Sequence, residues 1–399
     1  MKNKIPFSWP TYSFKEVAEV ITGTTPSTNH PEYYGDFIPF IGPAELGGVE
    51  PITKSSKNLS DEGAKQARLL PKEAVLICCI GATIGKVGFS GKKLATNQQI
   101  NALVCNNNIV FPRYVFYYCR TLESLFRHQG SSTTLPLLPK GRFQEIKIPV
   151  PPLEEQKRIA EILDQAEELR RKRKEAIAQL DTLNQSIFIE MFGDPVKNFK
   201  GWNITKVGEV ADVQGGLQVS SAARKKYPRE IPYLRVANVY RGYLDLSEIK
   251  MMRATDTEIH RTLLKKNDLL IVEGHGNPNE IGRVALWNGS INDCIHQNHI
   301  IRARFEIHKI IPLYACHYLN SPGGRQHLLK SGKTTSGLNT ISVSEVRATP
   351  VLLPPLSLQK EFAQRVEAVE ELKKSHRASL LELDALFASL QHRAFKGEL

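Results

Sequence analysis

Two segments of the chain have the apolar spacing of long helices. In residues 151–190 apolar side chains recur every three or four positions, and prolines and Glu154–Glu155 suit the helix start. Gly193 and Pro195 end the pattern, which predicts a helix of about 35 residues, about 52 Å long. The stripe comprises Ile159, Ile162, Ala166, Leu169, Ala176, Leu180, Leu183 and Ile187, is widened by Leu163 and Ile177, and is interrupted by Arg173.

The second segment repeats the first. Residues 354–395 align with 151–192 at a constant offset of 203, with 14 of 42 positions identical. Its apolar positions are Phe362, Val369, Leu372, Leu383, Leu386 and Leu390, with interruptions at Arg365 and His376. A helix with such a stripe must bury it, so we expect the two copies to pair as an antiparallel coiled coil related by a pseudo-two-fold axis. Arg173 and His376 should then meet near mid-helix.

The segments before the helices also repeat. SWPTYSFKEVAEVITG near Trp9 corresponds to GWNITKVGEVADVQGG near Trp202, and NQQI at 97–100 corresponds to QNHI at 297–300. Short apolar runs at 74–80 and 269–274 predict strands, whereas 111–126 and 310–320 predict amphipathic helices. We therefore predict an α/β (α+β) fold with two homologous modules, 1–150 and 201–353, each followed by a helical region, 151–200 and 354–399.

Charge divides along the same boundaries. The chain of 399 residues has 53 Lys and Arg against 41 Asp and Glu, a net charge of +12. Residues 1–150 hold 17 basic and 11 acidic residues, and 201–353 hold 20 and 13, whereas the helical regions hold 9 and 10, then 7 and 7. The whole excess lies on the modules. This distribution indicates two anion-binding surfaces on a neutral frame.

Composition excludes several protein classes. Hydrophobic residues make up 41% of the chain, enough for folded cores. No uninterrupted apolar run reaches the roughly 18 residues of a membrane span, and MKNKIPFSWP lacks the apolar segment of a signal peptide. Six cysteines without a CxxC pair indicate reduced thiols rather than disulfides or zinc. We expect a cytoplasmic protein without a bound metal.

The sequence lacks recognisable catalytic motifs. GATIGK at 81–86 resembles a phosphate loop but is one residue short and is followed by Val87. Its counterpart shares only the IG[KR]V pattern, so the glycine should form a turn, with Lys86 and Arg283 facing outward. HGNPNE at 275–280 lacks the second proline and aromatic residue of amino-methyltransferases, and no HExxH, GxSxG or nuclease-type carboxylate cluster occurs. No catalytic residue is predicted.

Polar, turn-rich loops recur in both modules, and their side chains are of the types that contact base edges and phosphates. Any one such loop could simply be solvated, so the inference is collective. The DNA-binding candidates are Thr24, Thr25, Ser27, Asn29, Lys86, Gln98, Ser131, Ser132 and Thr133 in the first module, and Gln218, Arg224, Lys225, Lys226, Arg235, Asn238, His275, Asn277, Arg283, Gln297, Asn298, Lys333 and Thr334 in the second.

Several stretches resemble a known family. IPVPPLEEQKRIAEILDQAEEL, MFGDPVKNFKGW and PPLSLQKEF resemble the conserved regions of the specificity subunits of Type I restriction–modification enzymes, and TGTTPST and G-x-IGKV resemble their target recognition domains. The second helix departs from the pattern at Ser357 and Leu358, where acidic residues are usual. The resemblance covers essentially the whole chain.

The resemblance implies a specific function. Each module would read one half of a bipartite site on double-stranded DNA, and the helices would fix the spacing. The conserved regions would dock two methylation subunits, and restriction subunits would join them. Adenosylmethionine, ATP and Mg would be bound by those partners, with no cofactor in this chain. Two alternatives remain: a methyltransferase or nuclease with fused recognition domains, and a coiled-coil scaffold that binds no DNA.

Overall fold

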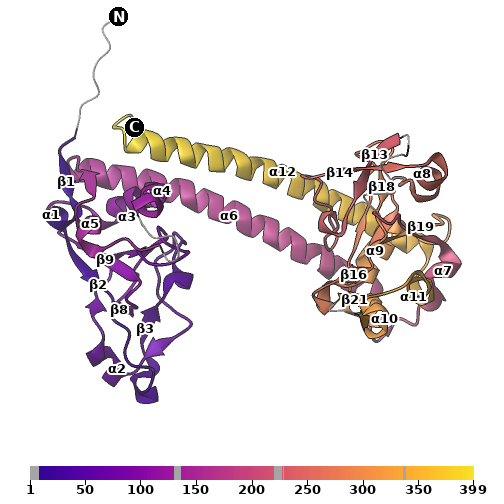
Figure 1. The fold of residues 1–399 in the computed structure, drawn as a ribbon, viewed down its shortest axis with the longest axis horizontal. Coiled ribbons are helices and arrows are strands. Elements are labelled where there is room, and N and C mark those ends of the chain that lie inside the picture. Colours follow the sequence, from indigo (N-terminus) through magenta and orange to yellow (C-terminus); the bar gives the residue numbers. More distant parts are fainter. Residues whose placement is uncertain (1–8, 130–135, 220–226, 228, 336–337) are drawn as a thin grey trace, which may run out of the picture. The chain divides into compact units, whose positions relative to one another are not determined.

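The computed structural model describes residues 9–129, 136–219, 227, 229–335 and 338–399. The chain divides into two compact units, one of residues 1–176 with 376–399 and one of residues 177–375. Each unit contains one module, part of helix α6 (Leu153–Phe192) and part of helix α12 (Leu356–Ala394), shown in Figure 1. Among the described residues no helix is long and apolar enough to cross a membrane.

The first module is a mixed α/β domain built on two four-stranded sheets, ordered β2-β9-β6-β7 and β4-β3-β8-β5. Its elements are β1 (Thr11–Ser13), α1 (Phe14–Val17), β2 (Ala18–Thr22), β3 (Tyr34–Ile41), β4 (Asn58–Leu59), α2 (Asp61–Gln66), β5 (Leu69–Leu70), β6 (Val75–Cys78), β7 (Val87–Phe89), β8 (Leu94–Thr96), β9 (Ile100–Cys105), α3 (Pro112–Thr121), α4 (Glu123–Gln129), α5 (Lys140–Gln144) and β10 (Lys147–Pro149).

The second module repeats the main sheet of the first, whereas its second sheet has three strands, ordered β14-β13-β18, and a further sheet is ordered β16-β21-β20. Sheet β12-β19-β15-β17 matches β2-β9-β6-β7, and the pair β11-β22 matches β1-β10. Its elements are β11 (Asn203–Lys206), α7 (Val207–Val210), β12 (Ala211–Gly215), β13 (Arg229–Leu234), β14 (Lys250–Ala254), α8 (Asp256–Thr262), β15 (Leu269–Val272), β16 (Gly274–His275), β17 (Val284–Leu286), β18 (Ile295–His296), β19 (Ile300–Phe305), α9 (Pro312–Asn320), α10 (Pro322–Ser331), β20 (Lys333–Thr335), β21 (Leu338–Thr340), α11 (Val343–Ala348) and β22 (Pro350–Leu353).

The two long helices pair antiparallel in each unit, as the repeat predicts. In the first unit Arg170 binds Asp384 at 2.6 Å, and in the second Lys373 binds Asp181 at 2.6 Å. These ion pairs are equivalent under the 203-residue offset, so the same contact between the helices occurs once in each unit. The predicted contact between Arg173 and His376 is confirmed, with Nη1 and Nδ1 2.6 Å apart.

The predicted apolar stripe is only partly buried. Ile159, Ala166 and Ile187 are buried, whereas Leu169 and Leu183 are 52% and 42% exposed, so the stripe is wrong there. Burial continues instead on the neighbouring helical row, at Gln156, Leu163, Asn184 and Met191. Gln156, Leu163 and Met191 of that row pack against the modules, whereas Asn184 donates to Glu370 of α12. α12 repeats the pattern, with Leu372 and Leu386 each 48% exposed.

A repeated glutamine fastens each module to its helix. Gln156 accepts a hydrogen bond from the Phe111 amide at 2.7 Å, and Gln359 accepts one from the Ile311 amide at 2.8 Å. Their side-chain amides donate to the carbonyls of Pro151 and Pro354. Both glutamines are fully buried, so these bonds satisfy groups that would be costly to leave unpaired. The PPLxxQ sequence is therefore a structural clamp.

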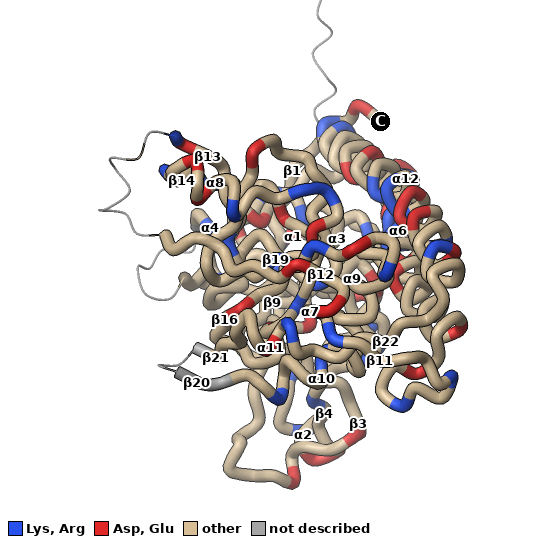
Figure 2. Tube along the Cα trace, turned by 90° about the vertical axis from the view of Figure 1, so that its right-hand side faces the viewer, with Lys and Arg blue, Asp and Glu red and all other residues tan. Residues whose placement is uncertain are grey.

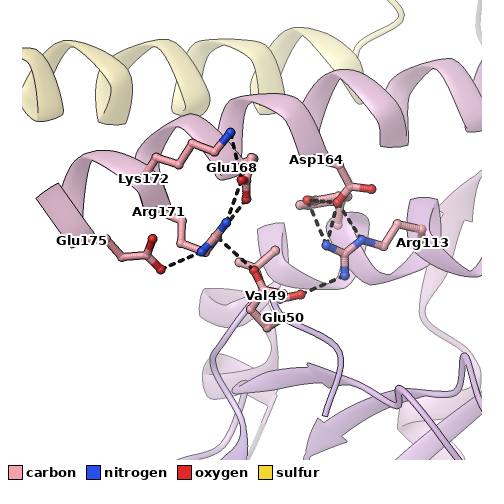
Figure 3. Close-up of polar contacts among 9 residues, drawn as sticks. Val49, Glu50, Arg113, Asp164, Glu168, Arg171, Lys172 and Glu175 are labelled. Atoms are coloured by element: carbon pink, nitrogen blue, oxygen red, sulfur yellow. Dashed lines mark hydrogen bonds and ion pairs between the residues drawn. The ribbon is translucent and has the colours of Figure 1, made fainter. Parts of the chain in front are cut away.

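The first module has a second clamp, which Figure 3 shows. Arg113 on α3 donates to the Asp164 carboxylate at 2.6 and 2.8 Å and to the Val49 carbonyl at 2.9 Å. Its guanidinium also lies 4.6 Å from the centre of the Phe116 ring. The repeat-equivalent residue is Leu313, which packs against the core of the second module. The first module is thus held by an ionic contact where the second uses an apolar one.

Candidate nucleic-acid interface

One edge of each central sheet gathers the polar loops. In the first module Thr22 pairs with Asn101, Cys78 with Ile100, and Ile77 with Val87. β2 and β6 therefore end, and β7 and β9 begin, at the same edge. We call this the loop edge, because the segments 23–33, 79–86 and 97–99 all leave the sheet there. In the second module the equivalent segments are 216–219, 273–283 and 297–299.

The loop edge of the first module brings several predicted residues together. The Thr25 hydroxyl donates to the Gln98 side chain, and the Thr24 amide donates to the Thr96 carbonyl at 2.9 Å. Gly23 makes this approach possible, since a Cβ there would lie 2.1 Å from the Asn97 carbonyl oxygen. Thr25 and Gln98 are exposed. Two separate polar segments thus form one surface.

Other predicted residues of this module lie on the same loops. Ser27 and Asn29 are exposed beyond Thr25, and the Asn29 amide donates to the Ser27 hydroxyl at 3.3 Å. Lys86 is half-buried in the turn between β6 and β7. Arg68, which the sequence analysis did not select, is exposed and donates to the Thr22 carbonyl at 2.9 Å. It stands alone before a short strand, so no sequence pattern marks it.

The second module forms the corresponding surface. The backbone amide of Asn298 donates to the Leu217 carbonyl at 2.7 Å. This bond joins segment 297–299 to the loop that bears Gln218. His275 pairs with Asn339 across β16 and β21, and its Nδ1 accepts from the Asn277 amide at 3.0 Å. Gln297 and Asn298 are half-buried, whereas Gln218 and Asn277 are exposed. The loops gather as in the first module.

Two predicted residues have structural roles instead. Arg283 does not face outward as predicted: its side chain is 7% exposed, binds Glu280 at 3.0 Å and donates to the Val236 carbonyl. The guanidinium of Arg283 also lies over the Tyr240 ring, 5.1 Å from its centre, so the side chain packs inside the module. Asn238 is buried and donates to the carbonyls of Asp245 and Glu248. Both residues shape the loop rather than its surface.

The remaining candidates differ in how far the structure describes them. Arg235 is half-buried and pairs with Glu248 at 2.9 Å. For Lys333 and Thr334 the structure describes the backbone alone, in β20. The other candidates lie outside the described residues: Ser131, Ser132, Thr133, Arg224, Lys225 and Lys226.

A cleft beside the first module carries the wrong charge for DNA. It has a volume of about 450 Å³, and its lining includes Glu50, Glu73, Asp164, Glu167 and Glu168. Arg113 is the single basic residue of that lining and is already paired with Asp164. Glu167 and Glu168 also pair with Arg170 and Arg171, so the basic groups beside the cleft are engaged within the protein. The loop edge therefore remains the candidate surface for DNA. Within the described residues no group of acidic, His and Cys side chains could hold a metal ion.

Glu273 at the loop edge of the second module was also missed by the sequence analysis. It follows β15 directly and is half-buried. Burial raises the pKa of its carboxyl to about 7, from the ordinary value of 4.5. The run GHGNPNE marks the loop after the strand as polar, whereas Glu273 itself has the pattern of the last residue of an apolar strand.

This carboxyl should make stability depend on pH. The pKa of the Glu273 carboxyl is higher in the folded state than in the unfolded state, because burial favours its neutral form. The contribution of this carboxyl to the free energy of unfolding is therefore complete below about pH 4.5 and is lost as the pH rises through 7. Glu273→Gln should therefore raise the free energy of unfolding at pH 8 by on the order of 1 kcal/mol, allowing for partial exposure, with little change near pH 4.5. Thermal unfolding at both pH values measures this. Wild type and variant share the neighbouring titratable and charged residues His275, His299, Glu280 and Arg283. Equal free energies of unfolding at pH 8 would therefore contradict a raised pKa for Glu273.

Comparisons with known proteins agree with this architecture. Among solved structures, a Type I restriction–modification system component whose structure addressed complex assembly and conformational transition matches the whole chain with a TM-score of 0.63 at 18% identity. The Type I S subunit from M. genitalium matches 99% of this chain and 98% of its own with a TM-score of 0.57 at 15% identity. These matches establish the fold: two homologous modules on two long antiparallel helices.

Sequence comparisons identify the family. The specificity subunit of the Type I restriction enzyme MjaIX from Methanocaldococcus jannaschii is 24% identical, covering 99% of this chain and 94% of that protein. The EcoKI specificity subunit from Escherichia coli is also 24% identical, covering 99% and 90%. The model of the Type I restriction modification DNA specificity domain matches twice, at residues 6–179 and 199–384. The chain therefore belongs to the family of Type I restriction–modification specificity subunits, the non-catalytic DNA-recognition components of these systems.

Proposed function

We propose that the chain reads a bipartite DNA sequence, each module recognising one half-site through its loop edge. The observation that supports this most directly is the duplicated edge itself. Thr25 and Gln98 in one module, and Gln218, His275 and Asn298 in the other, stand on equivalent loops of modules that carry all the excess positive charge. Basic charge supplies affinity for phosphates, while varied polar side chains can distinguish base edges.

The long helices would set the distance between the half-sites. α6 has 40 residues and α12 has 39, about 60 Å each at 1.5 Å per residue. Figure 2 shows Lys and Arg interspersed with Asp and Glu along both helices. Ion pairs such as Arg170–Asp384 use these charges within the protein. Neither helical region has a net positive charge to attract DNA, so both are suited to contacts with protein.

The exposed leucines indicate where partners dock. Leu169 and Leu372 are identical under the 203-residue offset, as are Leu183 and Leu386, and all four are exposed. A leucine that occurs in both copies of the helix but is not buried does not serve the core. Contact with a partner protein explains its presence better. Because the apolar sites come as a repeat-related pair, we infer two copies of one partner, the methylation subunit. Restriction subunits would join this assembly in the cytoplasm.

In this proposal the partners bind every cofactor. Adenosylmethionine would be held by the methylation subunits, and ATP and Mg by the restriction subunits. Adenosylmethionine binding by this chain alone, measured by calorimetry, would favour the alternative of a fused methyltransferase. The other alternative, a scaffold without DNA binding, predicts that charge reversal at Lys225, Lys226 and Lys333 leaves target recognition unchanged.

Exchanging one module tests the proposal directly. Replacing residues 1–150 with the equivalent module of another family member should change one half-site and leave the other half-site and the gap unchanged, because each loop edge belongs to a separate sheet. The measurement is the set of adenines methylated in random-sequence DNA by the complex with its methylation subunit. The reciprocal exchange of residues 201–353 is the matched control. Simultaneous change of both half-sites would contradict independent reading.

A further inference from the structure

Glu273 occupies a position that the repeat defines closely. Its amide donates to the His299 carbonyl at 3.0 Å, and its carbonyl accepts from the Ile341 amide at 2.9 Å. In the first module Cys79 makes the same two backbone bonds, with Gln99 and Leu138. The backbone frame is therefore the same. Cys79 is 3% exposed and packs into the core, whereas the second module has a half-buried carboxyl at that place.

The Glu273 carboxyl has no hydrogen bond or ion pair with any residue that the structure describes. Other shielded acids in this module are paired. Asp268 binds Arg304 at 2.7 Å, and Glu280 binds Arg283 at 3.0 Å. A half-buried carboxylate without a partner costs stability, and burial accordingly raises the pKa of Glu273 to about 7. The fold does not require a carboxyl at this position, because the equivalent position of the first module is occupied by Cys79.

The surroundings of Glu273 belong to the candidate DNA surface. Glu273 begins the loop-edge segment 273–283, and its bond to the His299 carbonyl ties it to the segment 297–299 of the same edge. A carboxylate on such a surface is repelled by phosphates, so it opposes DNA binding in general. It can favour binding only where DNA offers a hydrogen-bond donor. In the major groove the exocyclic amino group of cytosine is such a donor, and Glu and Asp are its usual partners.

We propose that Glu273 reads a base, its carboxylate accepting a hydrogen bond from the N4 amino group of a cytosine in the half-site of the second module. This rests on the proposed function and adds that the loop edge of the second module lies in the major groove, where cytosine presents its N4 amino group. The Glu273 carboxylate favours DNA with cytosine at one position and lowers the affinity for DNA of any other sequence. Removing it should weaken discrimination at one base pair and strengthen binding to unrelated DNA.

The test uses two variants in the full chain assembled with its methylation subunit. Glu273→Gln keeps the size of the side chain, and Glu273→Cys places the residue of the first module on the same backbone frame. The probe is a library of random-sequence duplexes, selected by binding and sequenced. Wild type should select a C·G pair at one position of the second half-site. Both variants should reduce that preference about tenfold, change no position of the first half-site, and bind non-cognate duplexes more tightly at low salt.

Glu306→Gln is the matched control, because Glu306 follows β19 at the opposite end of the same sheet and pairs with Lys309. Its selected sequence should equal that of wild type. The first half-site reports folding within each experiment. An unchanged cytosine preference in both variants would overturn the role of Glu273, as would loss of the whole second half-site with the first intact. A wild-type selection without any motif would instead overturn the proposed function.

Discussion

Aspartate in place of both Leu169 and Leu372 should leave the chain unable to bind its methylation subunits, with DNA methylation reduced at least 100-fold. Both leucines are about half exposed and occupy equivalent helix positions, one in each compact unit. Charge at the centre of an apolar contact commonly costs several kcal/mol, whereas exposed substitutions alter folding stability by about 0.5 kcal/mol or less. Native mass spectrometry of the reconstituted complex counts the bound subunits.

The single variants sharpen this prediction. Leu169→Asp alone and Leu372→Asp alone should each give complexes with one methylation subunit, because each removes one of two equivalent sites. Leu381→Asp is the control, since Leu381 is 71% exposed on the same helix but its repeat counterpart is Ala178. It should assemble with two subunits. Full assembly of the double variant would show that the leucines are not the docking sites.

Removing one seven-residue segment from each helix, 174–180 from α6 and 374–380 from α12, should abolish binding to the original site, with a loss of at least 100-fold. Seven residues are two helical turns, so the helical faces stay nearly in phase while each helix shortens by about 10 Å. That length corresponds to about three base pairs at 3.4 Å each. Selection from random-sequence DNA should return the same two half-sites with a gap about three base pairs shorter.

Matched deletions are needed because the helices pair antiparallel. Deleting residues 174–180 alone would displace Asp181 from Lys373, which are 2.6 Å apart in the second unit. That single deletion should destabilise the chain, and thermal unfolding would report it. If the double deletion kept the original gap, the helices could not be what sets the spacing. If it altered a half-site, the modules would not read independently of the frame.

Most of the architecture could be predicted from the sequence because the chain contains an internal repeat, so that each half indicates the structure of the other. The gapless repeat of 151–192 at 354–395 predicted two equivalent helices, and their antiparallel pairing brought Arg173 to His376. The apolar spacing could not distinguish a residue facing the other helix from one facing a partner. The spacing therefore predicts core positions for Leu169 and Leu183, which the structure leaves 52% and 42% exposed.

The site was less predictable, for physical reasons. Loop composition located the polar segments, and strand pairing brought them to one edge. Composition could not show that Arg283 turns inward to Glu280 and Tyr240, since an arginine in a loop is usually solvated. Nor could it distinguish Glu273 from an ordinary surface acid. Its significance depends on partial burial, on the lack of a partner among the described residues, and on the equivalence of its backbone with Cys79.

The central claim is that two modules read two separated half-sites. The most direct test is selection from random-sequence duplexes by the complete chain with its methylation subunit, followed by sequencing of the bound DNA. We expect two short conserved blocks separated by an unread gap of fixed length, with adenines methylated in the blocks. A single contiguous block, or two blocks with a variable gap, would contradict it.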